Sequence, residues 1–211
     1  MRGLYLVTDR RLCGPRSLEE VVLMAVRGGA ACVQLREKSL STLAFVQEAQ
    51  RIKAILAPFG AALIINDRID VALAVGADGI HIGQSDMPAH MARELMGPRA
   101  LVGLSVETWE DVERARTMDV DYLGVSPVFD TPTKTDTKEH WGLEGIRRIR
   151  AATRLPLVAI GGLHAANAED AVRAGADSIA VVSAICSAPD PFLASQELHL
   201  IIESALLQRG N

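Results

Sequence analysis

Short runs of apolar, β-branched residues alternate along the chain with amphipathic stretches of helical period. Strands that are apolar on both faces are typical of a buried parallel sheet, and one-sided apolar periodicity indicates helices packed against it. The strands predicted in this way cover residues 4–8, 31–35, 62–65, 79–82, 101–104, 122–125, 157–160 and 178–182. The predicted helices cover residues 18–27, 42–56, 69–75, 89–96, 109–117, 143–151, 165–173 and 192–207.

The joints between helices and strands repeat. A Gly-Ala pair ends a helix and begins the next strand at residues 29–30, 76–77 and 175–176, and Asp-Val-Asp occupies the matching place at residues 119–121. Glycine can adopt the left-handed backbone that often ends a helix. Because these joints precede the second, fourth, sixth and eighth strands, the chain is predicted to contain four β-α-β-α quarters.

Eight right-handed β-α units that close on themselves form a TIM barrel, so we expect an α/β fold of the (β/α)8 class. No linker rich in Pro, Gly or Ser divides the sequence, and we therefore expect a single domain over residues 1–211. An open doubly wound sheet is the alternative fold. It would favour a glycine-rich first turn, which this sequence lacks.

Composition narrows the class of protein. With 211 residues, 49% of them hydrophobic, and a mean hydropathy of +0.18, the chain can bury a sizeable core. Its net charge of −4, without a basic run, argues against sequence-independent binding of nucleic acid. Cys13, Cys32 and Cys186 lie far apart without metal-binding spacing, which favours reduced thiols in a cytoplasmic protein. The sequence begins without a secretory leader and has no membrane-length apolar segment, so no membrane association is expected, whereas a homo-oligomer is possible.

Residues at the carboxyl ends of the predicted strands are chemically biased. In a barrel these ends meet at one rim, where neighbouring strands are about 4.8 Å apart. Alternation after the second strand places Gln34, Arg36 and Lys38 on one face. The remaining polar and glycine residues of the rim are Asn66, Asp67, Asp86, Ser105, Thr131, Thr133, Lys134, Gly161, Gly162 and Ser183, with Val182 beside the last.

Each of these residues also has an interpretation that needs no ligand. Asp67, Asp86 and Ser183 could cap the helices that follow them, because Asp and Ser are favoured N-caps. The basic residues after the second strand could be solvated charges that pair with Glu37 or with a neighbouring helix. His81 lies inside a strand and is better explained as a hydrogen-bonded core histidine than as a catalyst.

Considered together, the rim residues favour binding of anions. Arg36, Lys38 and Lys134 converge there with Asp67 and Asp86, and neighbouring carboxylates repel unless a cation lies between them. Mg²⁺ takes one or two protein carboxylates and leaves its other positions to waters and phosphate oxygens, while Arg and Lys bind further phosphate oxygens. The glycine turn after the seventh strand and the helix start after the eighth are typical of the phosphate cradle of TIM barrels. The residues thus predict one metal-assisted anion site and one without a metal.

Six motifs occur in order along the chain: VQLREK, INDRIDVALAVGADGIHIGQSD, GLS, SPVFDTPTK, VAIGG and VVSAI. In these motifs the sequence resembles the thiamine phosphate synthase family over essentially its whole length. The first two motifs are highly specific, whereas AIGG is shared by many phosphate-binding barrels. The resemblance implies a transferase of thiamine biosynthesis, which joins 4-amino-2-methylpyrimidine-5-methyl diphosphate to a thiazole phosphate, plain or carboxylated, and releases pyrophosphate.

The resemblance also implies roles for individual residues. Those that would hold the diphosphate are Arg36, Lys38, Asn66 and Lys134, with Gln34 and Ser105 near the pyrimidine. Those that would bind Mg²⁺ are Asp67 and Asp86. Those that would contact the thiazole phosphate are Thr131, Thr133, Gly162, Val182 and Ser183. Among them, the three cationic side chains would be catalytic, because they stabilise the charge that grows on the departing pyrophosphate.

The sequence departs from the family at three positions. Ser126 and Asp130 stand where the family usually has Gly and Pro, and Glu107 stands where it often has His. A thiazole tautomerase of the sister family is the alternative function, but it would need no metal, and the intact pair Asp67 and Asp86 argues against it. A Schiff-base aldolase would require a lysine inside an apolar strand. A non-catalytic binding barrel would not require the metal pair.

Overall fold

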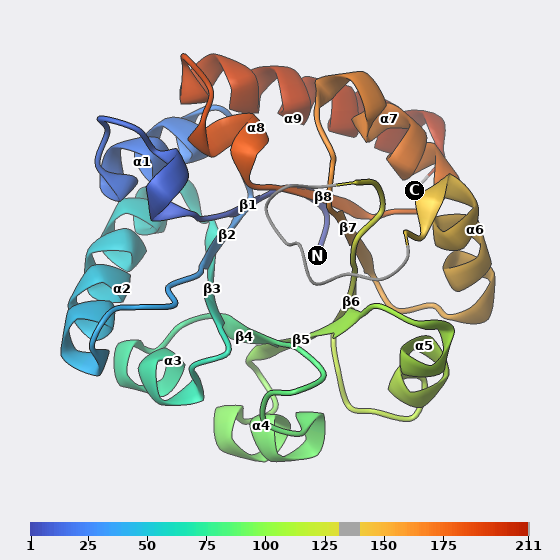
Figure 1. Ribbon diagram of the computed structural model, residues 1–211, viewed down its shortest axis with the longest axis horizontal. Helices are drawn as coiled ribbons and strands as arrows, with labels where there is room; N and C mark the ends of the chain where they lie inside the picture. The colour runs from blue at the N-terminus through green and yellow to red at the C-terminus, as the bar shows by residue number, and fades with distance from the viewer. Residues whose placement is uncertain (131–139, 211) are drawn as a thin grey trace.

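The chain folds into a closed barrel, as the repeat predicted (Figure 1). This computed structural model describes residues 1–130 and 140–210. Within them, eight parallel strands pair in chain order, and the last pairs with the first, which excludes the open doubly wound sheet. The strands are β1 (Gly3–Val7), β2 (Cys32–Leu35), β3 (Ala62–Asn66), β4 (Gly79–Ile82), β5 (Leu101–Val106), β6 (Tyr122–Val125), β7 (Leu157–Ile160) and β8 (Ser178–Val181).

Helices surround the ring of strands on its outside (Figure 1). They are α1 (Leu18–Arg27), α2 (Thr42–Leu56), α3 (Ile69–Val75), α4 (Ala89–Met96), α5 (Trp109–Ala115), α6 (Gly142–Ala152), α7 (Ala165–Ala174), α8 (Ser183–Cys186) and α9 (Pro191–Gln208). Two 3-10 turns that the periodicity did not predict are η1 (Arg10–Leu12) and η2 (Ala57–Phe59). None of the helices in the described ranges is long and apolar enough to cross a bilayer.

Alternate positions of the strands supply two separate cores. Side chains that point outward pack against the helices and form the larger core, whereas the interior of the barrel holds a smaller one. The buried members of the interior core are Tyr5, Val7, Cys32, Ile64, Tyr122, Val158 and Ala180. Because this set contains two tyrosines, the interior combines apolar contacts with hydroxyl groups that need hydrogen-bonding partners.

Two glycines make room for the rings inside the barrel. A Cβ atom built on Gly103 would lie 2.0 Å from Cζ of Tyr122, and one built on Gly124 would lie 2.8 Å from Cε1 of His81. Contacts that short do not occur between real atoms, so a side chain at either position would displace a ring. Glycine inside these strands therefore marks a close approach, not a turn.

An aspartate before each of three even-numbered strands ties that strand to its neighbour at the end of the barrel opposite the rim. A carboxylate oxygen of Asp78 accepts a hydrogen bond from the backbone N–H of Leu63 at 2.8 Å, and Asp121 accepts one from Val102 at 2.7 Å. Asp177 repeats the contact with Leu157 at 2.9 Å. The repeat seen in the sequence thus includes a side chain that closes the gap between successive strands.

Asp177 also joins two helices to the barrel. Its carboxylate accepts hydrogen bonds from Arg150 of α6 at 2.9 Å and from Arg209, which follows α9, at 2.6 Å. All three side chains are largely buried, with exposed fractions of 21%, 28% and 17%. The contact therefore stabilises the junction of β7, β8, α6 and α9.

We predict that Asp177→Ala lowers the free energy of unfolding by about 2–3 kcal/mol, because it leaves two largely buried guanidinium groups and a backbone N–H without their shared acceptor. The loss is measured as a lower urea midpoint at an unchanged slope of unfolding. Glu169→Ala is the control, because it removes an exposed pair with Arg173 and should cost less than about 0.5 kcal/mol. Equal losses in the two variants would contradict the role of Asp177.

Candidate active site

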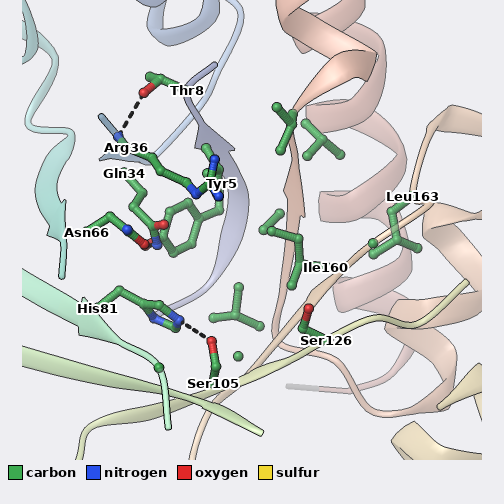
Figure 2. A pocket seen from close by; sticks show the side chains of 18 of the residues that line it. Tyr5, Thr8, Gln34, Arg36, Asn66, His81, Ser105, Ser126, Ile160 and Leu163 are labelled. Carbon is green, nitrogen blue, oxygen red and sulfur yellow. Dashed lines mark hydrogen bonds between the residues drawn. The ribbon is translucent and has the colours of Figure 1, made fainter. Parts of the chain in front are cut away.

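A cavity of about 880 Å³ opens at the carboxyl ends of the strands. Every predicted site residue that the structure describes lines it, namely Gln34, Arg36, Lys38, Asn66, Asp67, Asp86, Ser105, Gly162, Val182 and Ser183. Thr131, Thr133 and Lys134 lie outside the described residues. Figure 2 shows Gln34, Asn66 and His81 on one wall, with Ile160 and Leu163 across the cavity. The barrel therefore brings residues from separate strands to one place.

The segment after β2 sends alternate side chains into the cavity. Gln34, Arg36 and Lys38 line it, and Glu37 between them does not. The backbone N–H of Arg36 donates to Oγ1 of Thr8, at 3.0 Å, which fixes the segment against β1 (Figure 2). Among the described residues, Glu37 forms no ion pair with Arg36 or Lys38 and pairs with Arg10 instead. The hypothesis that Glu37 neutralises these two basic residues is therefore wrong.

Asp67 does not cap the helix that follows it. α3 has Arg68 at its N-cap, without a side-chain capping bond. Asp67 has a left-handed backbone with φ of 61°, and its N–H donates to the carbonyl of His81 at 2.9 Å. A left-handed conformation costs a residue with a Cβ about 1 kcal/mol, although Asp tolerates it better than most. The turn places the carboxylate in the cavity, where it pairs with Nζ of Lys38 at 2.6 Å.

Asp86 is likewise no helix cap. α4 has Pro88 at its N-cap, and the Asp86 carboxylate instead accepts a hydrogen bond from the N–H of Gly83 at 2.7 Å. Partial burial raises the pKa of Asp86, and the neighbouring carboxylate of Asp67 raises it further. Since the Asp67 carboxylate is close enough to affect that of Asp86, the two chain segments meet closely at the rim.

The two aspartates fit a magnesium ion better than a metal that needs many protein ligands. No group of three or more His, Cys, Asp or Glu residues gathers as a metal site in the described ranges. Mg²⁺ is often held by one or two carboxylates, with waters and substrate phosphates completing its coordination. The pKa of Asp86 is raised first by partial burial and then by the Asp67 carboxylate, and a divalent cation bound between the two carboxylates would oppose both effects. The donor set is therefore compatible with Mg²⁺.

A chain of hydrogen bonds forms the floor of the cavity. The amide of Gln34 donates to the hydroxyl of Tyr5 at 2.9 Å, and that hydroxyl lies 3.1 Å from the hydroxyl of Tyr122. Nδ1 of His81 lies 3.1 Å from the Tyr122 hydroxyl, and Nε2 lies 2.9 Å from Oγ of Ser105. Burial raises the pKa of both tyrosines, so they remain neutral. These hydrogen bonds connect Gln34 to Ser105, the two residues that the family resemblance implies near the pyrimidine.

Sequence analysis missed part of this floor. His81 is hydrogen-bonded, as expected of a core histidine, but it also lines the cavity, and so do Tyr5, Thr8 and Tyr122. A signal was available: Tyr5 and Tyr122 occupy the inward-facing positions of their strands, on the same face of the sheet as Gln34. The rings of both tyrosines are apolar and fit core positions, so sequence analysis did not consider the hydroxyl at the end of each ring as part of the cavity.

The turn after β7 packs against the segment after β6. Gly161 and Gly162 have positive φ of 102° and 65°, and a Cβ on Gly162 would lie 2.5 Å from the carbonyl oxygen of Asp130. Within the described chain the N–H groups of both glycines donate to no other group. The turn is therefore demanded by packing, and it leaves two N–H donors beside the cavity.

Ser183 begins α8 as its first residue, with Val182 at the N-cap and no side-chain capping bond. The hypothesis that Ser183 is an ordinary cap is therefore wrong, and both residues line the cavity opposite the aspartates' segment of the barrel. The Ser183 hydroxyl is consequently available for a ligand.

Of the three positions that depart from the family, two line the cavity and the third is exposed to solvent. Ser126 and Glu107 line the cavity, and the bond between Ser126 and Pro127 is cis. Asp130, 95% exposed, forms an ion pair with His140 at 2.8 Å when that histidine is protonated. The extra carboxylate is therefore directed to solvent and to His140.

Comparison with known proteins identifies the family of this chain. Residues 4–185 match the model of the family described as thiamine monophosphate synthase. A thiamine-phosphate synthase of Albidiferax ferrireducens is 58% identical over 95% of this chain and 92% of its own length, and one of Vibrio campbellii is 50% identical over 92% and 95%. A solved thiamine phosphate pyrophosphorylase from Pyrococcus furiosus superposes with a TM-score of 0.88 at 38% identity, over 97% of this chain and 96% of that one. The chain belongs to the thiamine monophosphate synthase family.

Proposed function

We propose that this chain joins 4-amino-2-methylpyrimidine-5-methyl diphosphate to a thiazole phosphate, to give thiamine phosphate and pyrophosphate. The observation that carries the proposal is the meeting of Asp67 and Asp86, neither of them a helix cap, with Lys38 and Arg36 in one cavity. Such a set suits a substrate whose leaving group carries several negative charges.

The reaction breaks the bond between the pyrimidine methylene carbon and the diphosphate oxygen, and the electron pair departs with pyrophosphate. The ring amine stabilises the resulting benzylic-like cation, and the thiazole nitrogen forms the new bond to the same carbon. No side-chain nucleophile is required, and none of the three cysteines is among the described lining residues. The residues therefore act by position and charge.

Arg36 and Lys38 would stabilise the departing diphosphate. No carboxylate of the described chain pairs with the Arg36 guanidinium, which leaves its fork of donors for phosphate oxygens. Lys38 brings a second positive charge to the edge of the cavity at Asp67. Asn66, 8% exposed at the end of β3, and Lys134 of the undescribed segment would complete this grip.

Asp67 and Asp86 would hold Mg²⁺ beside the diphosphate. When bound, the ion would neutralise negative charge on the phosphate oxygens that the protein's own cations do not reach. The protein side of this arrangement is the left-handed turn at Asp67 and the hydrogen bond from Gly83 that orients Asp86.

The acceptor would lie on the opposite part of the rim. The N–H groups of the turn at Gly161 and Gly162, with Ser183, line the cavity and would hold the thiazole phosphate. Gln34 and Ser105, joined through the floor of hydrogen bonds, would hold the pyrimidine between the two anion sites. Mass spectrometry of the product formed from the two substrates, with and without Mg²⁺, tests the proposed function directly. Absence of thiamine phosphate in the presence of Mg²⁺ would exclude it.

We predict that Asp67→Asn and Asp86→Asn each lower kcat/KM roughly 30- to 1000-fold, equivalent to about 2–4 kcal/mol of transition-state stabilisation. Both variants should also require more Mg²⁺ for half-maximal rate, which is measured by titrating the ion. Asp70→Asn is the matched control, because Asp70 pairs with Arg68 outside the cavity. Near-normal rates for both variants at limiting Mg²⁺ would exclude the metal site.

We predict that Lys38→Ala and Ser183→Ala affect different substrates. Lys38→Ala should lower kcat and weaken binding of the pyrimidine diphosphate, because charge grows on the diphosphate leaving group in the transition state. Ser183→Ala should raise KM for the thiazole phosphate about tenfold with kcat nearly unchanged, because the charge of that phosphate is constant through the reaction. Steady-state kinetics with each substrate varied separately measures both effects. A rise in KM for the same substrate in both variants would contradict the assignment of two sites.

A further inference from the structure

Three charged side chains form a cluster on the outer side of the segment that carries Arg36 and Lys38. Glu37 of that segment lies 3.3 Å from Arg10 of η1, measured from Oε1 to Nε. The same guanidinium contacts Glu48 of α2. The side chains of Glu37 and Glu48 are only 6% and 2% exposed, whereas that of Arg10 is 46% exposed. We call these three residues the anchor cluster.

The anchor cluster is costly for folding. Two buried carboxyl groups share a single cation, and Oε1 of Glu37 and Oε2 of Glu48 have no hydrogen-bonding partner among the described residues. Burial raises the pKa of Glu37, and the charge of Glu48 raises it further, against the opposing effect of Arg10. Apolar side chains would fill the same space at lower cost. Stability alone therefore does not explain the cluster.

The geometry of the segment after β2 relates the cluster to the cavity. Arg36 and Lys38 line the cavity and Glu37 between them does not, so the side chain of Glu37 lies on the other side of the segment, against Arg10. Arg10 of η1 holds that outward side chain directly, and Glu48 of α2 in turn holds the Arg10 guanidinium. On the other side, the N–H of Arg36 is held by Thr8. The segment is thus fixed both to the end of β1 and to α2.

We propose that Glu37, held by Arg10, which Glu48 in turn fixes, is a positioning residue that keeps Arg36 and Lys38 directed into the cavity. The proposal rests on the proposed function in one respect, the assignment of these two cations to a diphosphate. Glu37 touches no substrate in this arrangement. Its effect is on the conformational entropy that the segment with Arg36 and Lys38 loses on binding. Without the anchor cluster, this segment would have to be ordered each time the diphosphate binds.

The first measurement is the affinity for inorganic pyrophosphate with Mg²⁺, by calorimetry, in Glu37→Ala and in the wild-type protein. We expect Kd to rise about tenfold or more, since ordering the released segment would reduce the binding energy. Glu37→Gln, which preserves the shape of the side chain, should retain more affinity than Glu37→Ala. Glu19→Ala is the matched control: it removes an ion pair between α1 and Arg51 of α2, 2.8 Å long, away from the cavity, and should leave Kd unchanged.

The second measurement separates positioning from a general loss of structure. In steady-state kinetics, Glu37→Ala should raise KM for the pyrimidine diphosphate and change KM for the thiazole phosphate less than about twofold. In a background of Arg36→Ala and Lys38→Ala, adding Glu37→Ala should change Kd less than about twofold, because a residue that acts through these cations has no effect once they are absent.

Three results would overturn the proposal: an unchanged Kd in a folded Glu37→Ala protein, an equal rise in KM for both substrates, or a full additional loss in the double-alanine background. If Glu37→Ala fails to fold, Glu37→Leu replaces it with the same expectations, because leucine fills the buried space and cannot pair with Arg10. A wild-type protein that binds pyrophosphate but forms no thiamine phosphate would refute the proposed function alone. The calorimetric comparison would still decide the role of Glu37.

Discussion

The parallel pairing of β8 with β1 is the constraint on which the rest of the structure depends. Closure leaves no sheet edge, and because every strand runs in the same direction, all eight carboxyl ends lie on one rim. Asp67 and Asp86 are nineteen residues apart, yet they follow β3 and β4, which are neighbours in the barrel. The same closure places the glycine turn after β7 beside Ser183 after β8. The two ends of the barrel therefore differ: the rim carries the groups proposed to bind anions, whereas the opposite end carries the aspartates that tie successive strands together.

The interior of the barrel shows how one set of side chains serves both purposes. The rings of Tyr5 and Tyr122 fill the barrel interior as large apolar groups, and their hydroxyls form part of the hydrogen-bonded floor of the cavity. A buried hydroxyl without a partner costs about 1–3 kcal/mol, so each member of the chain is needed by the next. The missing side chain of Gly103 is part of the same arrangement, because any Cβ there would overlap the ring of Tyr122. Packing therefore fixes the floor before any substrate binds, and its hydrogen bonds fix the side chains of Gln34 and Ser105 in turn.

The fold could be predicted from the sequence because its signals are local and repeated. Periodicity and the joints before even-numbered strands both predict the barrel, and Gln34, Asn66 and Ser105 were found by their position at strand ends. What could not be predicted depends on contacts between distant elements. Glu48 is a charged residue of an amphipathic helix, and its pattern alone indicates solvent exposure; its burial follows only from the position of η1 against α2. The left-handed turn at Asp67 was also missed, because an aspartate before a helix is normally its cap.

The places where local rules fail gather around the cavity. Asp67 has a backbone conformation that favours glycine, two carboxylates meet at the rim, and two more are buried with one arginine between them. Many other elements follow the rules closely, with capping boxes at Ser17 and Thr108 and strands apolar on both faces. Unfavourable local energies are expected where a protein must hold charges in a geometry that its own stability would not select. For a reaction driven by stabilising a leaving diphosphate, the required geometry is a set of cations and carboxylates that are fixed before the substrate arrives. The strained turn directs the carboxylate of Asp67 inward, and the buried Glu37 holds the two cations beside it, so both costs serve the same preorganisation.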